Sequence, residues 1–237
     1  MSKKSTLYIV RHGKTMFNTI GRAQGWSDTP LTKKGEEGIH ELGAGLALEG
    51  LQFKAAFSSD SGRTMLTMDI LMEELGHPHI PYMKDKRIRE WCFGSLDGGY
   101  DKELFDGVLP RTNAYQSVRD FKNLTYETIA NGLIEADTAG WAEPWQIIYE
   151  RIWTGFEDIA HAVAKQGGGN ALVVSHGMTI GTLCSFIASK SFHRNRIDNA
   201  SVTIIEYDKN NGFHLVKIGD MSYRKKGREI LNSASNL

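Results

Sequence analysis

Leu7-Tyr8-Ile9-Val10-Arg11-His12-Gly13, near the start of the chain, is an apolar run that ends in an arginine, a histidine and a glycine. A short apolar run followed by polar residues is typical of a buried strand. In open α/β sheets, ligands bind beyond the carboxyl ends of the strands. The stretch therefore predicts a strand that delivers a cation and an imidazole to a ligand site, although so short a motif does not define one by itself.

A second stretch of the chain repeats this arrangement. Ala171-Leu172-Val173-Val174 is again apolar, and Ser175-His176-Gly177 follows it. If the two strands are parallel neighbours, His12 and His176 lie at the same edge of the sheet. One such histidine is more often a hydrogen-bonded structural residue, but the pair favours a functional site.

The rest of the chain alternates between predicted strands and helices. We predict further strands at 55–58, within 80–88, at 202–207 and at 213–218, and helices at 33–48, 61–75, 102–108, 125–134, 144–165 and 178–188. This alternation is typical of α/β proteins. We expect one domain, residues 1–237, with a three-layer α/β/α sandwich, a mostly parallel central sheet, an antiparallel edge from the last two strands, and a helical insertion at about 98–143.

Composition limits the classes of partner. The 237 residues carry 28 Lys+Arg and 28 Asp+Glu, so no net charge attracts the chain to nucleic acid or an anionic membrane. Cys92 and Cys184 lack the spacing of metal ligands, and we expect free thiols in a reducing compartment. No apolar run approaches the roughly 18 residues of a membrane span. We expect a cytoplasmic protein that binds neither nucleic acid nor membrane.

Two arginines suggest which ligand the paired histidines serve. Arg11 precedes His12, and Arg63 begins the helix predicted after Ser58-Ser59-Asp60-Ser61-Gly62. Guanidinium groups offer forked donors that match phosphate oxygens better than ammonium groups do. The sequence therefore predicts a local phosphate site at this edge of the sheet.

With these motifs, the chain resembles the histidine phosphatase superfamily, the phosphoglycerate mutase-like family, over nearly its whole length. The resemblance rests on motifs in the family's order, namely Arg11-His12-Gly13, Asp28-Thr29-Pro30-Leu31-Thr32 with Gly35, Arg63, Arg89-Glu90, Phe93-Gly94 and Ser175-His176-Gly177. It implies that the insertion is a cap over the active site.

The resemblance also implies a role for each residue. His12 would attack phosphorus and carry the phosphoryl group, while Arg11, Arg63 and His176 would hold the phosphate oxygens and stabilise the transition state. Glu90 would protonate the leaving oxygen and then activate water. Neither a metal nor another cofactor is implied, because guanidinium charge replaces magnesium. The expected substrate contacts are Thr15, Asn18, Gln24 and Gly25.

Several residues keep a second interpretation. Thr15 equally suits a turn, and Lys14 either adds charge near the phosphate or points to solvent. Without the motif, Glu90 would be a surface carboxylate paired with Arg87 or Arg89. Asp97 and Glu103 remain alternative acids. Five aromatic residues have two possible roles: they line a leaving-group pocket, or they form the core of the insertion. We favour the core role for these residues, which are Trp91, Phe93, Tyr100, Phe105 and Trp141.

Two other motifs carry less weight. Gly13-Lys14-Thr15 imitates the end of a P-loop, but that motif requires a glycine where this chain has Tyr8. His77-Pro78-His79 offers two metal ligands without a nearby thiol or carboxylate cluster, so a turn is the better interpretation.

The family contains hydrolases and mutases, and the sequence favours a phosphatase. Arg22-Ala23-Gln24-Gly25 resembles the loop of the broad-specificity phosphatases, and Arg111 stands without the adjacent arginine expected in mutases, Arg119 lying further on. The expected substrate is a small phosphomonoester and the product inorganic phosphate; a homodimer is compatible with this. The alternatives are a 2,3-bisphosphoglycerate-dependent phosphoglycerate mutase, for which that compound would be the cofactor, and a non-catalytic module that binds a phosphorylated ligand.

Overall fold

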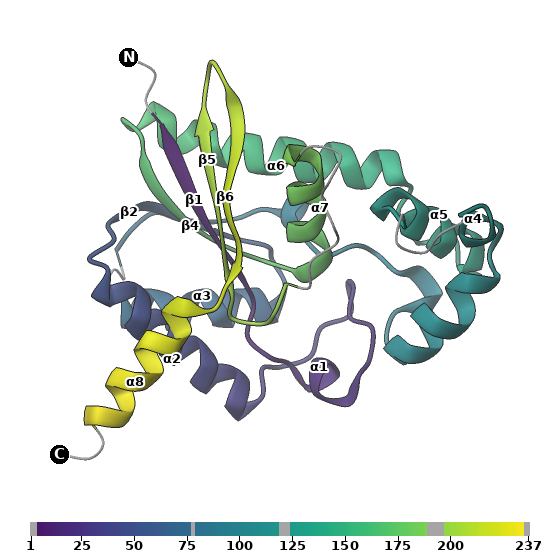
Figure 1. Cartoon of the computed structure of the whole chain (residues 1–237), viewed down its shortest axis with the longest axis horizontal. Coiled ribbons are helices and arrows are strands. Elements are labelled where there is room, and N and C mark those ends of the chain that lie inside the picture. The colour runs from purple at the N-terminus through teal and green to yellow at the C-terminus, as the bar shows by residue number, and fades with distance from the viewer. Residues whose placement is uncertain (1–3, 77–78, 119–123, 189–196, 235–237) are drawn as a thin grey trace.

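A computed structural model describes residues 4–76, 79–118, 124–188 and 197–234. At its centre lies a six-stranded sheet in the order β3-β2-β4-β1-β5-β6 (Figure 1). The strands are β1 (Ser5–Arg11), β2 (Phe53–Ser58), β3 (Tyr82–Lys84), β4 (Gly169–Ser175), β5 (Val202–Asp208) and β6 (Gly212–Asp220). The first four pair in parallel, whereas β5 runs antiparallel to β1 and β6. The predicted mostly parallel sheet with an antiparallel edge is confirmed.

The two motif-bearing strands are direct neighbours. In the register of β1 and β4, Arg11 lies opposite Ser175. The histidines follow immediately, and the backbone N–H of His12 donates to the carbonyl of Ser175 at 3.1 Å. The expectation that His12 and His176 share one edge of the sheet is therefore confirmed.

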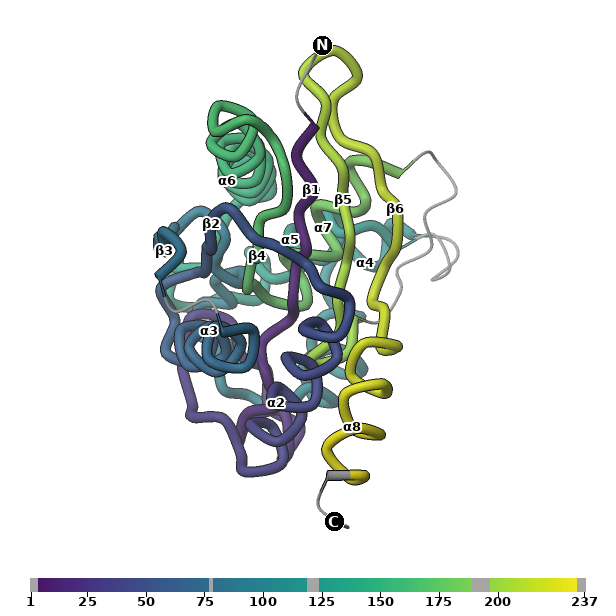
Figure 2. The backbone as a smooth tube through the Cα atoms, turned by 90° about the vertical axis from the view of Figure 1, so that its left-hand side faces the viewer, coloured from purple at the N-terminus to yellow at the C-terminus, as the bar shows by residue number. Residues whose placement is uncertain are grey.

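Alternating side chains of β1 supply the two apolar layers. Leu7 and Ile9 belong to a core packed with α6 (Trp145–Lys165) and α7 (Gly177–Ile187). Val10 belongs to a second core, together with α2 (Lys33–Leu48) and α3 (Gly62–Glu74), and Tyr8 packs against it. Successive residues of a strand point to opposite faces, so one buried strand serves both cores. Figure 1 shows α6 and α7 on one side of the strands and α2 and α3 on the other, which confirms the three-layer architecture, and Figure 2 shows the strands in sequence from β3 at the left to β6 at the right.

The C-terminal helix α8 (Ser222–Ala234) was not predicted from the sequence. It packs along α2 at a very short separation. A Cβ atom on Gly45 would lie 1.8 Å from the carbonyl oxygen of Tyr223, and one on Gly227 would lie 1.8 Å from that of Glu41. Glycine on both helices permits this approach, which explains why two breaker-like residues occur within helices.

The segment at 98–143 consists of short helical pieces. It contains a π-helix at Glu103–Val108, a 3-10 turn at Leu109–Arg111, α4 (Asn113–Gln116) and α5 (Tyr126–Ala136). The helix expected at 102–108 is thus wider than an α-helix. In Figure 1, α4 and α5 lie together beyond the N-terminal half of α6. The strand expected within 80–88 is limited to β3, and a 3-10 turn, Lys86–Ile88, follows it.

Both cysteines are free and buried. Burial raises the pKa of the Cys184 thiol to about 12, which keeps it protonated and unreactive. Among the described residues, no helix combines the length and the apolar composition needed to cross a membrane.

Candidate active site

His12 is placed directly after β1, and its ring has one defined tautomer. Nδ1 lies 2.8 Å from the carbonyl oxygen of Gly13. A carbonyl only accepts, so Nδ1 donates and Nε2 carries the lone pair. Burial, followed by the charges of Arg63 and Arg11, holds the pKa of His12 well below its usual 6.5. The ring is therefore a neutral imidazole with a free basic nitrogen at neutral pH.

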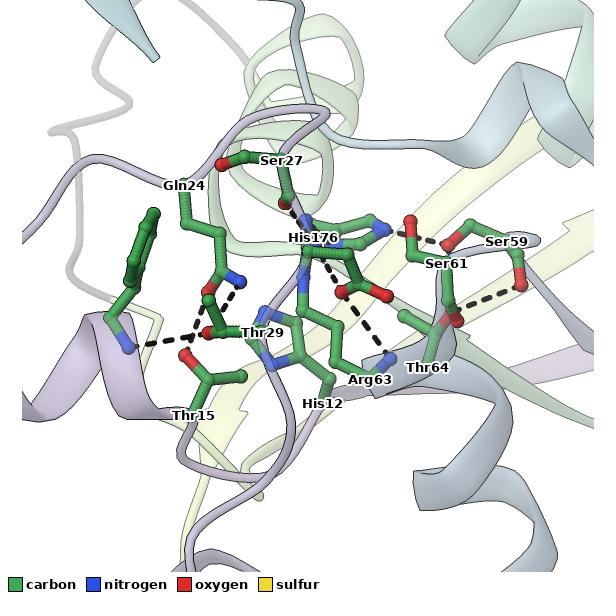
Figure 3. Close-up of polar contacts among 12 residues, drawn as sticks. His12, Thr15, Gln24, Ser27, Thr29, Ser59, Ser61, Arg63, Thr64 and His176 are labelled. Carbon is green, nitrogen blue, oxygen red and sulfur yellow. Dashed lines mark hydrogen bonds and ion pairs between the residues drawn. The ribbon is translucent and has the colours of Figure 1, made fainter. Parts of the chain in front are cut away.

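Arg63, in the first turn of α3, lies beside the second histidine (Figure 3). Its Nη2 donates to the carbonyl of Gly25 at 2.7 Å and to Nδ1 of His176 at 3.0 Å. Its Nη1 donates to Asp28 at 2.9 Å. Arg63 is 1% exposed, and its Nε–H has no partner among the described residues. A buried, unpartnered guanidinium N–H is the kind of group that an anion would satisfy.

The tautomer of His176 follows from these contacts. Because Nδ1 accepts from Arg63, Nε2 carries the proton and donates to Ser59 Oγ at 2.7 Å. The rings of His176 and His12 lie 5.3 Å apart. Burial, together with Arg63 and His12, lowers the pKa of His176 well below 6.5. Both ring nitrogens are engaged, and Nδ1 bears no proton in this tautomer, so it cannot donate to a phosphate oxygen.

Glu90 is buried at the start of α7 rather than at the surface. Its carboxylate accepts from the backbone N–H groups of Met178 at 2.9 Å and Thr179 at 3.0 Å, and also from that of Trp91 at 3.1 Å. Unpaired N–H groups and the dipole at a helix N-terminus stabilise negative charge. The alternative of a surface carboxylate paired with Arg87 or Arg89 is wrong: those arginines pair with Asp85, Asp158 and Asp60.

Arg151 of α6 fixes the backbone that carries Glu90. Its guanidinium donates to the carbonyls of Arg87, Arg89 and Glu90 at 2.9, 2.9 and 3.1 Å, and it also pairs with Glu143. Three carbonyls bound by one rigid group restrict the position of this segment. Sequence analysis did not identify Arg151, and nothing in its helical context signals this role.

The four expected substrate contacts divide into two groups. Thr15 caps α1 (Met16–Ile20), and its hydroxyl donates to Gln24 at 2.7 Å. Gly25 donates its N–H to Asp97 and accepts from Arg63. Thr15 and Gly25 thus form hydrogen bonds within the protein, whereas Asn18 and Gln24 line the cleft in front of His12. A role for any of the four in substrate binding stays a prediction.

The cleft has a volume of ≈ 520 Å³, and both polar and apolar side chains line it. The polar side chains are Arg11, His12, Asn18, Arg22, Gln24, Glu90 and Asp101, and the apolar ones are Phe93, Phe105, Tyr126, Met178 and Ile197. Phe105 and Tyr126 come from the segment at 98–143, so that segment forms part of the wall.

Other candidates lie away from the cleft. Trp91 is fully buried in the core, and Trp141 is 72% exposed. The carboxylate of Asp97 binds the backbone N–H groups of Gly25 and Ser27, and Glu103 is exposed. Asp101, which sequence analysis did not single out, lines the cleft instead, and burial raises its pKa.

The residues that the structure describes contain no group of three His, Cys, Asp or Glu side chains that could hold a metal ion. His79 is described, whereas His77 and Pro78 lie outside the described residues. Two neutral histidines, two arginines and a buried glutamate therefore lie together beyond the carboxyl ends of the parallel strands of this α/β protein, an arrangement whose fixed positive charge suits an anion.

Comparisons with known proteins identify the family. The model of the histidine phosphatase superfamily (branch 1) matches residues 7–221, and the chain belongs to this superfamily. A probable phosphoglycerate mutase, GpmB, of Salmonella choleraesuis is 29% identical over 224 residues, which cover 92% of this chain and 94% of the relative.

Two solved structures show the same fold. The phosphoglycerate mutase from Bacillus anthracis superposes with a TM-score of 0.87 at 35% identity, covering 96% of this chain and 98% of that one. YhfR of Bacillus stearothermophilus superposes with a TM-score of 0.70 at 29% identity, with coverage of 93% and 99%. The family predicted from the sequence motifs is confirmed.

Proposed function

We propose that this protein is a metal-independent phosphomonoester hydrolase that works through a phosphohistidine at His12. Nε2 attacks phosphorus as the ester P–O bond breaks. Glu90 Oε2 accepts one backbone N–H, from Met178, so it can also carry a proton, and in this step it gives that proton to the leaving oxygen. Water then attacks phosphorus, Glu90 takes a proton from it, and the P–N bond breaks. Inorganic phosphate leaves, while His12 and Glu90 return to their starting protonation states.

The charges around His12 support transfer through this residue. Arg11 lines the cleft beside it, and Arg63 presents a buried, unpartnered Nε–H in the same cluster. Fixed cations that are already desolvated stabilise the charge of a transferring phosphoryl group without reorganisation. In this proposal His176 is neutral, because its pKa is lowered well below 6.5, and its Nδ1 orients the Arg63 guanidinium.

The apolar wall beside Glu90 is the observation that favours hydrolysis. Phe93, Phe105 and Tyr126 line the cleft with Glu90, where a leaving group would lie. A mutase must also bind the carboxylate of phosphoglycerate, and Arg22, which lines the cleft in addition to Arg11, already donates to the Gly98 carbonyl and lies over the Tyr100 ring. Arg111 does not line the cleft, and Arg119 lies outside the described residues. Small phosphomonoesters whose leaving group has an apolar portion next to the phosphate are the substrates that fit.

The second candidate is a phosphoglycerate mutase that uses 2,3-bisphosphoglycerate. It is favoured by the names of the Salmonella relative and of the Bacillus anthracis structure. It requires the phosphoryl group on His12 to return to a substrate rather than to water. A non-catalytic module that binds a phosphorylated ligand would transfer the phosphoryl group neither to a substrate nor to water.

One pair of assays separates the three. Phosphate release from a panel of phosphomonoesters is measured beside conversion of 3-phosphoglycerate to 2-phosphoglycerate, with and without 2,3-bisphosphoglycerate. We expect phosphate release that a chelator does not reduce and acid-labile phosphate on the protein that His12→Ala abolishes. Rapid bisphosphoglycerate-dependent isomerisation with little phosphate release would identify a mutase, and phosphate binding without turnover would identify the module.

A further inference from the structure

A second cleft of ≈ 550 Å³ adjoins the active-site cleft. The two clefts share Arg11, Asn18 and Asp101 as lining residues. We call the second one the basic pocket and define it by the residues that line it alone and carry its polar character, Lys14, Lys34, Asp198, Asn199 and Arg224. The proposed reaction uses none of these five.

Two cations of the basic pocket have no carboxylate partner. Arg224 is paired with Glu41 at 2.7 Å. Lys14 and Lys34, in contrast, form no ion pair with any described residue, and both are exposed. The acids of the lining are Asp101 and Asp198, and they stand against four cations, Arg11, Lys14, Lys34 and Arg224. The lysines therefore leave positive charge available to a ligand.

The backbone holds these two lysines on one wall. The N–H of Thr32 donates to the carbonyl of Lys14 at 2.8 Å. Gly35, one residue after Lys34, lies so close that a Cβ atom there would be 2.1 Å from the same carbonyl oxygen. Lys14 follows the catalytic motif and Lys34 lies in the first turn of α2, so tertiary contacts alone bring them together.

Asn199 connects the basic pocket to the nucleophile. Its side-chain amide donates to the carbonyl of His12 at 3.0 Å and to Asn18 Oδ1 at 3.1 Å. A ligand in the basic pocket would thus lie against the polar groups that also border the reacting phosphate.

We propose that the basic pocket is an accessory site for an anionic phosphate or carboxylate group. That group is either the distal end of a substrate that reaches past Arg11 or a separate small anion. The first source rests on the proposed function, whereas the second does not. Each lysine would contribute a charge-assisted contact to the anion.

The test uses wild type, the double variant Lys14→Met/Lys34→Met, and Lys33→Met as a matched control. Lys33 is an exposed neighbour on α2 that does not line the pocket. One arm compares kcat/KM for butyl phosphate and for butane-1,4-diol bisphosphate. The other arm measures the stoichiometry of inorganic phosphate binding by calorimetry, which needs no turnover.

A distal group predicts that wild type prefers the bisphosphate and that the double variant loses about five- to tenfold of that preference, in keeping with two partly exposed charge contacts. A separate anion predicts two phosphates per wild-type chain and one per double-variant chain. In both cases Lys33→Met behaves as wild type. Unchanged preference together with unchanged stoichiometry overturns the site. Absence of hydrolysis in wild type refutes the proposed function but leaves the stoichiometry arm readable.

Discussion

The hydrogen bonds of two side chains decide whether the proposed chemistry works. His12 has a free Nε2 because Gly13 accepts from Nδ1. Glu90, in contrast, is held by the N–H groups that open α7. These contacts fix the orientation of the His12 and Glu90 side chains. For each side chain, a variant or a titration can separate its chemical role from its structural one.

Glu90→Gln removes the transferable proton and keeps the shape of the side chain. We expect kcat for an alkyl phosphate to fall about 10²- to 10⁴-fold, the usual range for loss of a general acid. The loss should be much smaller for p-nitrophenyl phosphate, because its leaving group needs little protonation. The measurement is steady-state kinetics with both substrates. Glu103→Gln serves as control, since Glu103 is exposed and outside the cleft; equal losses for the two substrates would exclude Glu90 as the acid.

His12 should stay neutral under mildly acidic conditions. Its pKa is lowered by burial and by the charges of Arg63 and Arg11, so protonation begins only well below pH 6.5. In a nitrogen-15 NMR titration, we expect its ring signals to keep the pattern of the Nδ1–H tautomer as the pH falls from 8 through 6.5. His12→Asn assigns the signals by their absence. Protonation at or above pH 6.5 would show that the arginines do not act on the ring as described.

At the scale of elements, sequence periodicity predicted those helices whose apolar residues recur on one buried side. The helix predicted at 33–48 matches α2, Lys33–Leu48, because Thr32 caps it and apolar residues recur on its buried side. It failed for α8, whose sequence is strongly polar and contains Gly227. That helix depends on its contact with α2, and the contacting residues Glu41 and Arg224 are 183 positions apart along the chain.

The contact between α2 and α8 gives a stability prediction. Gly45→Ala places a Cβ atom where the carbonyl of Tyr223 lies, so the helices must separate. We expect the free energy of unfolding to fall by about 1 to 3 kcal/mol, the usual range for overpacking that moves backbone. Urea denaturation measures it. Gly107→Ala is the matched control, because nothing lies within 4 Å of a Cβ atom there; similar losses in both variants would contradict the packing argument.

At the scale of the whole molecule, two buried neutral histidines make stability depend on pH. The pKa values of His12 and His176 are lowered by burial and by Arg63, whereas in the unfolded chain both histidines take up protons near pH 6.5. The unfolded state therefore binds more protons below that pH. The stability contributed by these two residues is fully present above pH 6.5 and is lost as the pH falls toward their folded pKa values.

Urea denaturation between pH 7.5 and 5.5 checks this sign. Well below pH 6.5, each histidine should remove about 1.4 kcal/mol per pH unit from the free energy of unfolding. His12→Gln should reduce the slope by one such increment. A slope that is the same in wild type and His12→Gln would mean that His12 titrates alike in both states.

Patterns of neighbouring residues along the chain were sufficient to predict much of the fold and the family of this protein. Apolar runs that end in Arg11-His12 and Ser175-His176 predicted two strands, their alternation with helices predicted a parallel sheet, and the order of the motifs predicted the superfamily, because these features depend on neighbouring residues. Tertiary structure alone decided the tautomer of His176, the burial of Glu90 at the start of α7, and its support by Arg151. It also decided that Lys14 and Lys34 meet in one pocket and that α8 packs on α2. These properties arise from atoms that are distant in sequence, and they become fixed only when the folded backbone brings those atoms within hydrogen-bonding or van der Waals distance.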